Sequence, residues 1–160
     1  MNNLKKIVLK SIAKNVCRLT GSTRPYRKIM GLAKNNNNDF IKSNCHGFTL
    51  YTLGFGDNPK IPKFTPHHVM DSFLTDNCYR SQEHNGIIVG FREGDDTLGH
   101  TGIIIPQNKG PLIFHQPDFG LPLELTTLES YLNKNKSLVK ESELEYYKYF
   151  PENSNLSYSR

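Results

Sequence analysis

The chain has 160 residues, of which 36% are hydrophobic and 11% aromatic, and it carries a formal net charge of +5. This length and composition predict one globular domain and exclude collagen-like, disordered and membrane-embedded classes. The basic excess favours anionic partners, but the lysines and arginines are scattered along the chain, so we expect no nucleic-acid partner.

The cysteines Cys17, Cys45 and Cys78 are odd in number and irregularly spaced, which argues against a disulfide framework and a paired-cysteine zinc motif. Near the amino terminus, Lys10 and Lys14 interrupt the apolar run before it reaches the length of a secretory signal. No stretch approaches the roughly 20 apolar residues that cross a bilayer. We therefore expect neither a Sec-type signal nor a transmembrane segment.

The first predicted element is an amphipathic helix from Leu4 to Leu19, because its apolar residues recur at three- and four-residue steps. Gly21 is a natural end for this helix. The asparagine-rich run at 34–39 predicts a polar loop. The single domain thus divides into an N-terminal helical arm, a core and a tail: 1–39, 40–150 and 151–160.

A short helix is expected next, over Cys45–Leu53, with Ser43 or Asn44 as its N-cap. The segment Gly56–Pro66 is rich in proline, glycine and aspartate, which predicts an irregular connection. A helical turn at His68–Leu74 completes the helical half of the core.

Strand patterns dominate the second half of the chain. The β-branched runs Gly86–Phe91 and Gly99–Ile105 flank a turn-forming segment and predict a hairpin. The later predicted elements are two strands, a helix capped by Thr126 or Thr127, and a last strand: Leu112–His115, Leu121–Leu125, Thr127–Leu132 and Glu145–Phe150. Helices followed by an antiparallel sheet indicate an α+β fold.

Cys45 is the candidate nucleophile, because it stands where the short helix is expected to begin. Unpaired backbone N–H groups and the positive end of the helix dipole favour the reactive thiolate, so we expect a lowered thiol pKa. The Cys45 N–H can also serve an oxyanion, and Gly47 permits close approach of a substrate or a neighbouring strand. The alternative is a buried structural thiol, which is common for cysteine.

His100 is the candidate base for Cys45. It opens an apolar strand, and alternation places it on the face opposite Thr101. An imidazole at the start of a strand can take the proton of a thiol at the start of a helix, if the sheet packs on that helix, and can later protonate the leaving amine. A structural histidine is the alternative interpretation.

A base also needs a group that fixes its tautomer. Three residues on or after the next predicted strand are candidates for this role toward His100: His115, Gln116 and Asp118. His115 and Gln116 are adjacent and point to opposite faces, so one of them at most can serve. We prefer His115, with Gln116 as its substitute.

Other histidines and cysteines do not predict a metal site, because the spacings match no common zinc pattern. This applies to His67, His68, Cys78 and His84. We expect no metal and no cofactor, and we interpret Cys17 and Cys78 as structural thiols.

These motifs resemble those of the NlpC/P60 group of papain-like cysteine peptidases and amidases, over roughly residues 43–132. Cys45-His46-Gly47-Phe48 matches the Cys-Ser-Gly-Phe-like nucleophile segment of that group. His100-Thr101-Gly102-Ile103 matches its His-Val-Gly-Ile-like base strand, and Ile113-Phe114-His115 matches the strand that carries a third polar residue. The chain departs from the group at Asn44, where aspartate is common, and at His46, where serine is usual.

The resemblance implies a papain-like fold in which N-terminal helices pack on a small antiparallel sheet. It also implies roles for the motif residues. Cys45 would be the nucleophile, His100 the base, and His115 or Gln116 the third catalytic residue. The cleft and its oxyanion side would be formed by Asn44, His46 and Gly47.

Within this group the chain is most similar to small amidase effectors that bacteria deliver through type VI secretion, by its segments 44–48 and 99–100, its basic charge and the lack of a signal sequence. The similarity implies peptidoglycan stem peptide as substrate and a cognate immunity protein as partner. It further implies synthesis in the bacterial cytoplasm, with export to the periplasm or a target cell by a dedicated secretion system.

Two other functions agree with the same residues. In one, the cysteine–histidine pair acts on a protein in a host cell, as a protease, deamidase or acyltransferase. In the other, the protein is an inactive binding module whose basic N-terminal arm holds an anionic partner. The sequence does not indicate the oligomeric state.

Overall fold

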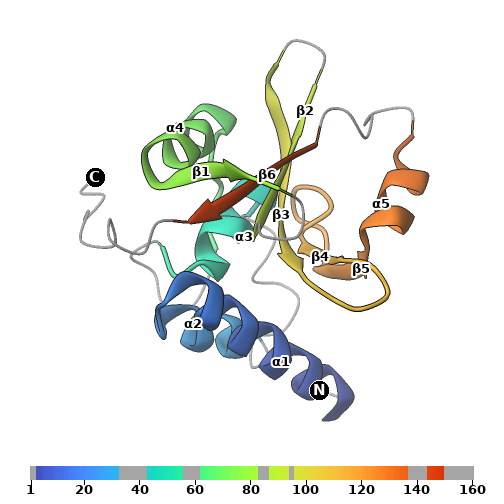
Figure 1. Cartoon of the computed structure of the whole chain (residues 1–160). Coiled ribbons are helices and arrows are strands. Elements are labelled where there is room, and N and C mark those ends of the chain that lie inside the picture. The colour runs from blue at the N-terminus through green and yellow to red at the C-terminus, as the bar shows by residue number, and fades with distance from the viewer. Residues whose placement is uncertain are drawn as a thin grey trace.

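The computed structural model describes residues 3–32, 43–55, 62–82, 87–93, 96–136 and 144–149. Over these ranges the chain is α+β, with five helices and six strands (Figure 1). The helices are α1 (Asn3–Thr20), α2 (Arg24–Leu32), α3 (Cys45–Thr52), α4 (His67–Asn77) and α5 (Leu128–Lys134). The strands are β1 (Cys78–Ser81), β2 (Ile88–Arg92), β3 (Leu98–Ile105), β4 (Leu112–His115), β5 (Glu124–Thr127) and β6 (Leu144–Tyr149).

The six strands form one antiparallel sheet in the order β1-β6-β2-β3-β4-β5. The predicted hairpin is confirmed, with β2 and β3 paired so that Phe91 lies opposite His100. β4 pairs with the other edge of β3, where Phe114 lies opposite Ile103. The last strand, β6, lies between β1 and β2. This topology puts β3, the strand that carries His100, in the interior of the sheet.

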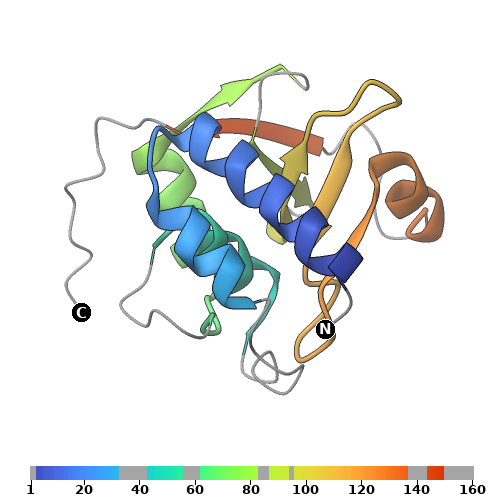
Figure 2. The same cartoon turned by 90° about the horizontal axis from the view of Figure 1, so that it is seen from below.

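The two faces of the sheet pack against different helices. Ile103 and Ile105 of β3 belong to the large core that also contains apolar side chains of α1 to α4. Ile104 belongs to a smaller core with Leu128 and Tyr131 of α5. Figures 1 and 2 show α5 apart from the other helices, across the sheet. The alternation predicted for β3 is therefore confirmed, and His100 shares the α5 face.

The N-terminal helices form part of the main core. The amphipathic helix predicted from Leu4 to Leu19 is α1, and Gly21 ends it with a φ of 64°. The buried side chains of α1 include Ile12 and Val16, and the helix contacts both β3 and α2 (Figure 2). The sequence analysis did not identify α2, although Pro25 in its first turn is a recognised start signal.

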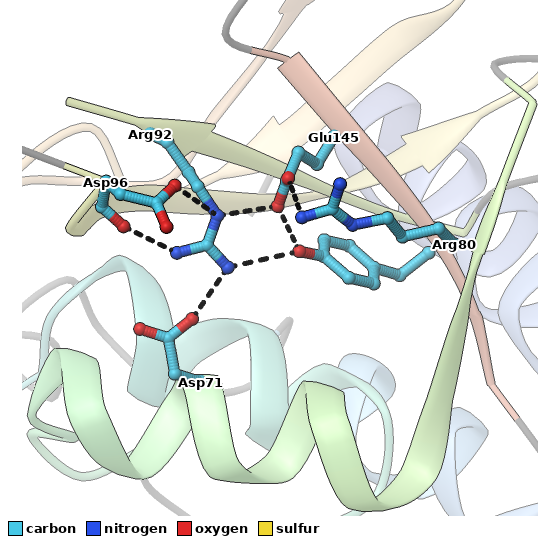
Figure 3. Close-up of polar contacts among 6 residues, drawn as sticks. Asp71, Arg80, Arg92, Asp96 and Glu145 are labelled. Carbon is cyan, nitrogen blue, oxygen red and sulfur yellow. Dashed lines mark hydrogen bonds and ion pairs between the residues drawn. The ribbon is translucent and has the colours of Figure 1, made fainter. Parts of the chain in front are cut away.

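A half-buried arginine joins α4 to the sheet (Figure 3). Arg92 of β2 donates to Glu145 of β6 at 2.7 Å and to Asp71 of α4 at 2.9 Å. It also donates to the Tyr147 hydroxyl at 3.3 Å, and Arg80 of β1 pairs with the same Glu145. Because the guanidinium presents several donors in a fixed plane, Arg92 links β2 and β6 to α4, and Arg80 connects β1 to the same network through Glu145.

Some element boundaries differ from the prediction. β1 was not expected, because its sequence Cys-Tyr-Arg-Ser has no β-branched residue, and it is held by its ladder with β6. The strand predicted at Leu121–Leu125 begins instead at Glu124 and runs to Thr127. α4 extends beyond the predicted turn, and most of the Gly56–Pro66 connection lies outside the described residues. Within the described ranges, no helix is both long and apolar enough to cross a membrane.

Candidate active site

Asn44 fixes the start of α3. Its side-chain oxygen accepts from the N–H groups of Gly47 and Thr65, each at 3.0 Å, and its amide donates to the Thr65 carbonyl at 2.8 Å. Of the two predicted caps, the structure thus selects Asn44 over Ser43. The same side chain caps α3 and, through Thr65, holds the segment at 62–66 against the start of the helix.

Gly47 is required by a close approach within the chain. A Cβ built at this position would lie 1.6 Å from the carbonyl oxygen of Lys63 and 3.2 Å from Oγ1 of Thr65. The sequence analysis expected Gly47 to admit a substrate or a neighbouring strand. The structure shows instead that the glycine makes room for the backbone of the 62–66 segment.

Cys45 is the first residue of α3 and is buried, with 8% of its surface exposed. Burial raises the pKa of its thiol above the ordinary value of 9.0, although backbone hydrogen bonds from Thr101, His46 and Cys45 itself act in the opposite direction. The expected lowering of the pKa at a helix start is therefore wrong for the resting protein. The helix-start N–H groups act as expected, but desolvation of the sulfur outweighs them.

The contacts of Cys45 place its sulfur at the same end of β3 as His100. Thr101, whose N–H reaches the sulfur, directly follows His100 in the strand. Tyr131 of α5 is a neighbour of both residues. Its ring stacks on His100 with 5.5 Å between centroids. The pKa of the Tyr131 phenol is raised mainly by burial and to a smaller extent by the nearby Cys45. Tyr131 thus stacks on the imidazole of His100 and lies near the thiol of Cys45.

His115 is the partner of His100. Nε2 of His100 lies 3.0 Å from Nδ1 of His115, in the β4 position that the motif predicted. The two rings are nearly perpendicular, at 85°, and the edge of His115 also meets the Tyr131 ring. Because Nε2 of His100 is engaged by His115, Nδ1 is the ring nitrogen left for the thiol of Cys45.

Both histidines are held neutral by their surroundings. Burial, then His115 and His46, lowers the pKa of His100 well below 6.5. Burial, then the charge of Lys134, lowers the pKa of His115 to about 4. At neutral pH the site therefore holds a neutral thiol beside a neutral pair of imidazoles.

His46 and Gln116 have structural contacts. Nδ1 of His46 lies 3.0 Å from the Thr101 hydroxyl, on the face of β3 opposite His100, and burial lowers the pKa of His46 to about 4. Its side chain is buried, with 4% of its surface exposed. Gln116 is also buried and donates to the Leu121 carbonyl at 3.1 Å.

Two loops meet beside the start of α3 and present a pair of exposed aromatic rings. Phe64 and Phe119 are 56% and 54% exposed, with 5.9 Å between their ring centroids in an edge-to-face arrangement. Gly120 donates to the Ser43 carbonyl at 3.3 Å, which ties the second loop to the residues before Cys45. This pair was not predicted, because single phenylalanines in loops 55 residues apart carry no pattern in the sequence.

The three cysteines are free thiols. Among the described residues, no group of three or more histidine, cysteine or acidic side chains is placed to share a metal ion. His67 and His68 are exposed on α4, and Cys78 is buried at the start of β1. His84, the fourth residue considered for a metal, lies outside the described residues.

Comparisons of the chain with protein-family models, with curated proteins and with solved structures gave no match. The resemblance to the NlpC/P60 group thus rests on its motifs alone. The structure adds that the three residues taken from those motifs, Cys45, His100 and His115, lie at one end of the β3–β4 pair.

Proposed function

We propose that the protein is a papain-like cysteine hydrolase of the NlpC/P60 type that cleaves an amide bond. The observation that carries this proposal is the 3.0 Å hydrogen bond between His100 and His115, formed next to the strand residue whose N–H reaches the Cys45 sulfur. A thiol at a helix start, an imidazole and a second group on the far ring nitrogen of that imidazole are the parts of a cysteine–histidine catalytic centre.

The reaction begins with transfer of the Cys45 proton to Nδ1 of His100, while the sulfur attacks the carbonyl carbon of the scissile amide. The amine leaves with the proton held by His100, and the acyl group stays on the sulfur as a thioester. Water then attacks the thioester as His100 takes its proton, which releases the acid and restores the thiol. Because the resting thiol is neutral, His100 acts as a general base during the attack.

The oxyanion of each tetrahedral intermediate needs backbone donors. At the start of α3, the Gly47 N–H is bonded by the Asn44 side chain and the Phe48 N–H by the Asn44 carbonyl. The N–H groups of Cys45 and His46 face the sulfur. They are the donors that an oxyanion formed on the attacked carbonyl meets first.

The proposed substrate is the stem peptide of peptidoglycan. The motif resemblance to small type VI amidase effectors supports this choice, and the net charge of +5 suits an acidic cell wall. Phe64 and Phe119 offer an exposed apolar surface for a bound peptide beside the nucleophile. A cognate immunity protein and delivery by a dedicated secretion system belong to the same proposal.

The test is digestion of purified peptidoglycan, followed by mass analysis of the released fragments. The wild-type protein is expected to release cleaved stem peptides, and Cys45→Ala is expected to release none while keeping its fold. Cys17→Ser, which changes a half-buried thiol of α1, is the matched control and is expected to retain activity. Full activity of Cys45→Ala would contradict the proposed nucleophile.

The raised pKa of the Cys45 thiol also fits an inactive binding module, because a protonated thiol is a poor nucleophile. Labelling with iodoacetamide at neutral pH separates the two functions. A hydrolase requires Cys45 to react faster than Cys78, a thiol that is equally buried, whereas equal rates for these two thiols together with an undigested wall would favour the binding module. Fast labelling with an undigested wall would indicate a protein substrate.

A further inference from the structure

His115 has a second ring nitrogen that its bond to His100 leaves unused. Nε2 is buried and, among the described residues, has no hydrogen-bond partner. It lies 4.0 Å from Oε2 of Glu124, the cross-strand neighbour of His115 in the β4–β5 pair. Both residues line a pocket of about 170 Å³, together with Ser130, Tyr131 and Lys134.

The proton between the two histidines has two possible positions with opposite consequences. If His115 carries its proton on Nδ1, it donates to Nε2 of His100, and the proton of neutral His100 then sits on Nδ1. In that state His100 has no free nitrogen to receive the thiol proton. If His115 carries its proton on Nε2, His100 donates from Nε2 and its Nδ1 is free.

Glu124 distinguishes between these two states. A carboxylate 4.0 Å from Nε2 of His115 favours a proton on that nitrogen and disfavours a lone pair there. Within the part of the chain that the structure describes, the other charged or titratable groups that face the His115 ring are His100 from β3 and both Tyr131 and Lys134 from α5. Lys134 lies 3.8 Å from the other oxygen of Glu124, so it holds the carboxylate between itself and His115.

We propose that Glu124 is a positioning residue that keeps the His115 proton on Nε2 and so keeps Nδ1 of His100 free to accept the proton of Cys45. This inference deepens the proposed hydrolase function and rests on it. Glu124 does not touch the reacting atoms and acts through two histidines. The Glu124 carboxylate sets the tautomer of His115, His115 sets that of His100, and His100 then accepts the thiol proton.

The direct test is the tautomer of His115, read from ¹⁵N chemical shifts of the histidine side chains in the full-length protein at pH 7.5. The wild type is expected to show a protonated Nε2 on His115 and on His100. Glu124→Leu is expected to move the His115 proton to Nδ1, and Glu124→Gln, which keeps an oxygen acceptor, is expected to stay close to the wild type. A protonated Nδ1 on wild-type His115, or an unchanged tautomer in Glu124→Leu, would overturn the proposal.

Two control variants distinguish an effect of the Glu124 carboxylate on the tautomer from a general disturbance of the surrounding structure. Lys134→Met removes the lysine contact but leaves the carboxylate, so His115 is expected to keep its Nε2 proton. Glu129→Gln changes an exposed carboxylate in the first turn of α5 and is expected to change nothing. Loss of the wild-type tautomer in Lys134→Met would assign the effect to the ion pair, against the proposal.

Kinetics give the functional consequence. Glu124→Leu is expected to lower kcat about 10-fold with little change in KM, and Glu124→Gln to recover most of the loss, as for a residue that sets a tautomer. Equal losses in both variants would overturn the role of the acceptor oxygen. Failure of the hydrolase function itself has a different signature, because the wild type would then show the predicted tautomer but release no fragments.

Discussion

His100 and His115 are hydrogen-bonded through Nε2 and Nδ1 at 3.0 Å, and at most 8% of either residue is exposed. Two buried imidazoles at this distance cannot both be charged without strong repulsion. The protein therefore folds around a neutral pair. Protonation of the pair destabilises the native state. The fold and the proposed chemistry therefore both require a pH at which the two histidines are neutral.

The first prediction is a loss of stability in mild acid. His46, His100 and His115 all have folded pKa values below the ordinary 6.5, about 4 for His46 and His115. A lowered pKa of a base stabilises the fold above pH 6.5, and this contribution is lost as the pH falls toward 4. For His46 and His115 it is on the order of 3 kcal/mol each.

The measurement is the urea midpoint of unfolding at pH values from 7.5 to 4. The midpoint is expected to fall steadily below pH 6.5. His68→Gln, which changes an exposed histidine of α4, is the control and is expected to leave the profile unchanged. A midpoint that stays constant down to pH 4.5 would show that these histidines are not buried in neutral form.

The second prediction concerns the reactivity of Cys45. Because burial raises the pKa of this thiol above 9.0, its alkylation rate is expected to keep increasing from pH 6 to pH 9. Cys78 is expected to react more slowly, since burial raises its pKa to about 12. The rates are measured by iodoacetamide labelling and mass analysis of peptides. A rate for Cys45 that is already constant below pH 7 would indicate a preformed thiolate and contradict the raised pKa.

The third prediction is that Gly47→Ala displaces the segment at 62–66. The added Cβ meets the Lys63 carbonyl oxygen at 1.6 Å, which is backbone and has no rotamer to change. The variant is expected to lose about 3 kcal/mol of stability, the upper part of the range for overpacking, and to lose activity as the start of α3 shifts. Chemical denaturation and the peptidoglycan assay are the two readouts.

Gly31→Ala is the matched control for this substitution. Gly31 lies within α2, and among the described residues a Cβ there would meet only the Tyr51 hydroxyl, at 3.6 Å, an ordinary contact. The control is expected to be neutral or more stable by up to about 1 kcal/mol, because alanine is the better helix former. If Gly47→Ala is tolerated as well as this control, the packing of Lys63 against α3 is not as tight as the structure shows.

The sequence predicted those parts of the site that depend on local pattern. A cysteine after a capping residue predicted the start of α3, and alternation along β3 predicted that His100 and Thr101 face opposite ways. His115 was preferred over Gln116 as the partner of His100, and the motif resemblance points to the same residue. In the structure His115 lies 3.0 Å from His100, and Gln116 donates to the Leu121 carbonyl.

Features that depend on distant segments could not be predicted. The pKa of Cys45 depends on how much protein covers the sulfur, and the helix start alone suggested the wrong direction. The approach of Lys63 to Gly47 joins a loop to α3, and the pairing of Phe64 with Phe119 joins two loops. None of these contacts leaves a periodic signal in the chain.

The fourth prediction is that Arg92 contributes to stability in a pH-dependent way. Arg92→Met is expected to cost about 2 kcal/mol at pH 7, because it leaves Asp71 and Glu145 partly buried without their shared partner. Burial opposes ionisation of Glu145, but hydrogen bonds from Tyr147 and Arg92 hold its pKa below the ordinary value. A lowered acid pKa stabilises the fold above about pH 4.3, and this contribution is lost as the pH falls further.

The cost of Arg92→Met is therefore expected to shrink below pH 4, where Glu145 becomes protonated in both proteins. Thermal unfolding of both proteins from pH 3 to 7 measures this difference. Lys148→Met, on β6 near the network, is the control, with a cost that does not depend on acid pH. A constant cost for Arg92→Met over this range would mean that its charge does not matter and that packing alone is lost.

The last prediction uses the position where the chain departs from the NlpC/P60 motif. Asn44→Ala removes the helix cap and both bonds to Thr65, so it is expected to cost about 2 to 3 kcal/mol. Asn44→Asp keeps an acceptor for the Gly47 and Thr65 N–H groups and adds a favourable charge at the helix start, but it cannot donate to the Thr65 carbonyl. Its cost is expected to lie between those of the wild type and the alanine variant.

The aspartate variant also tests the electrostatics of the nucleophile. A negative charge one residue before Cys45 disfavours the thiolate, so Asn44→Asp is expected to raise the thiol pKa further and slow alkylation at pH 8. Asn44→Ala brings no charge, and its labelling rate at pH 8 is expected to equal or exceed that of the wild type. If the aspartate variant reacts faster than the wild type, the helix cap controls the thiol through its geometry, and the electrostatic account of Cys45 is wrong.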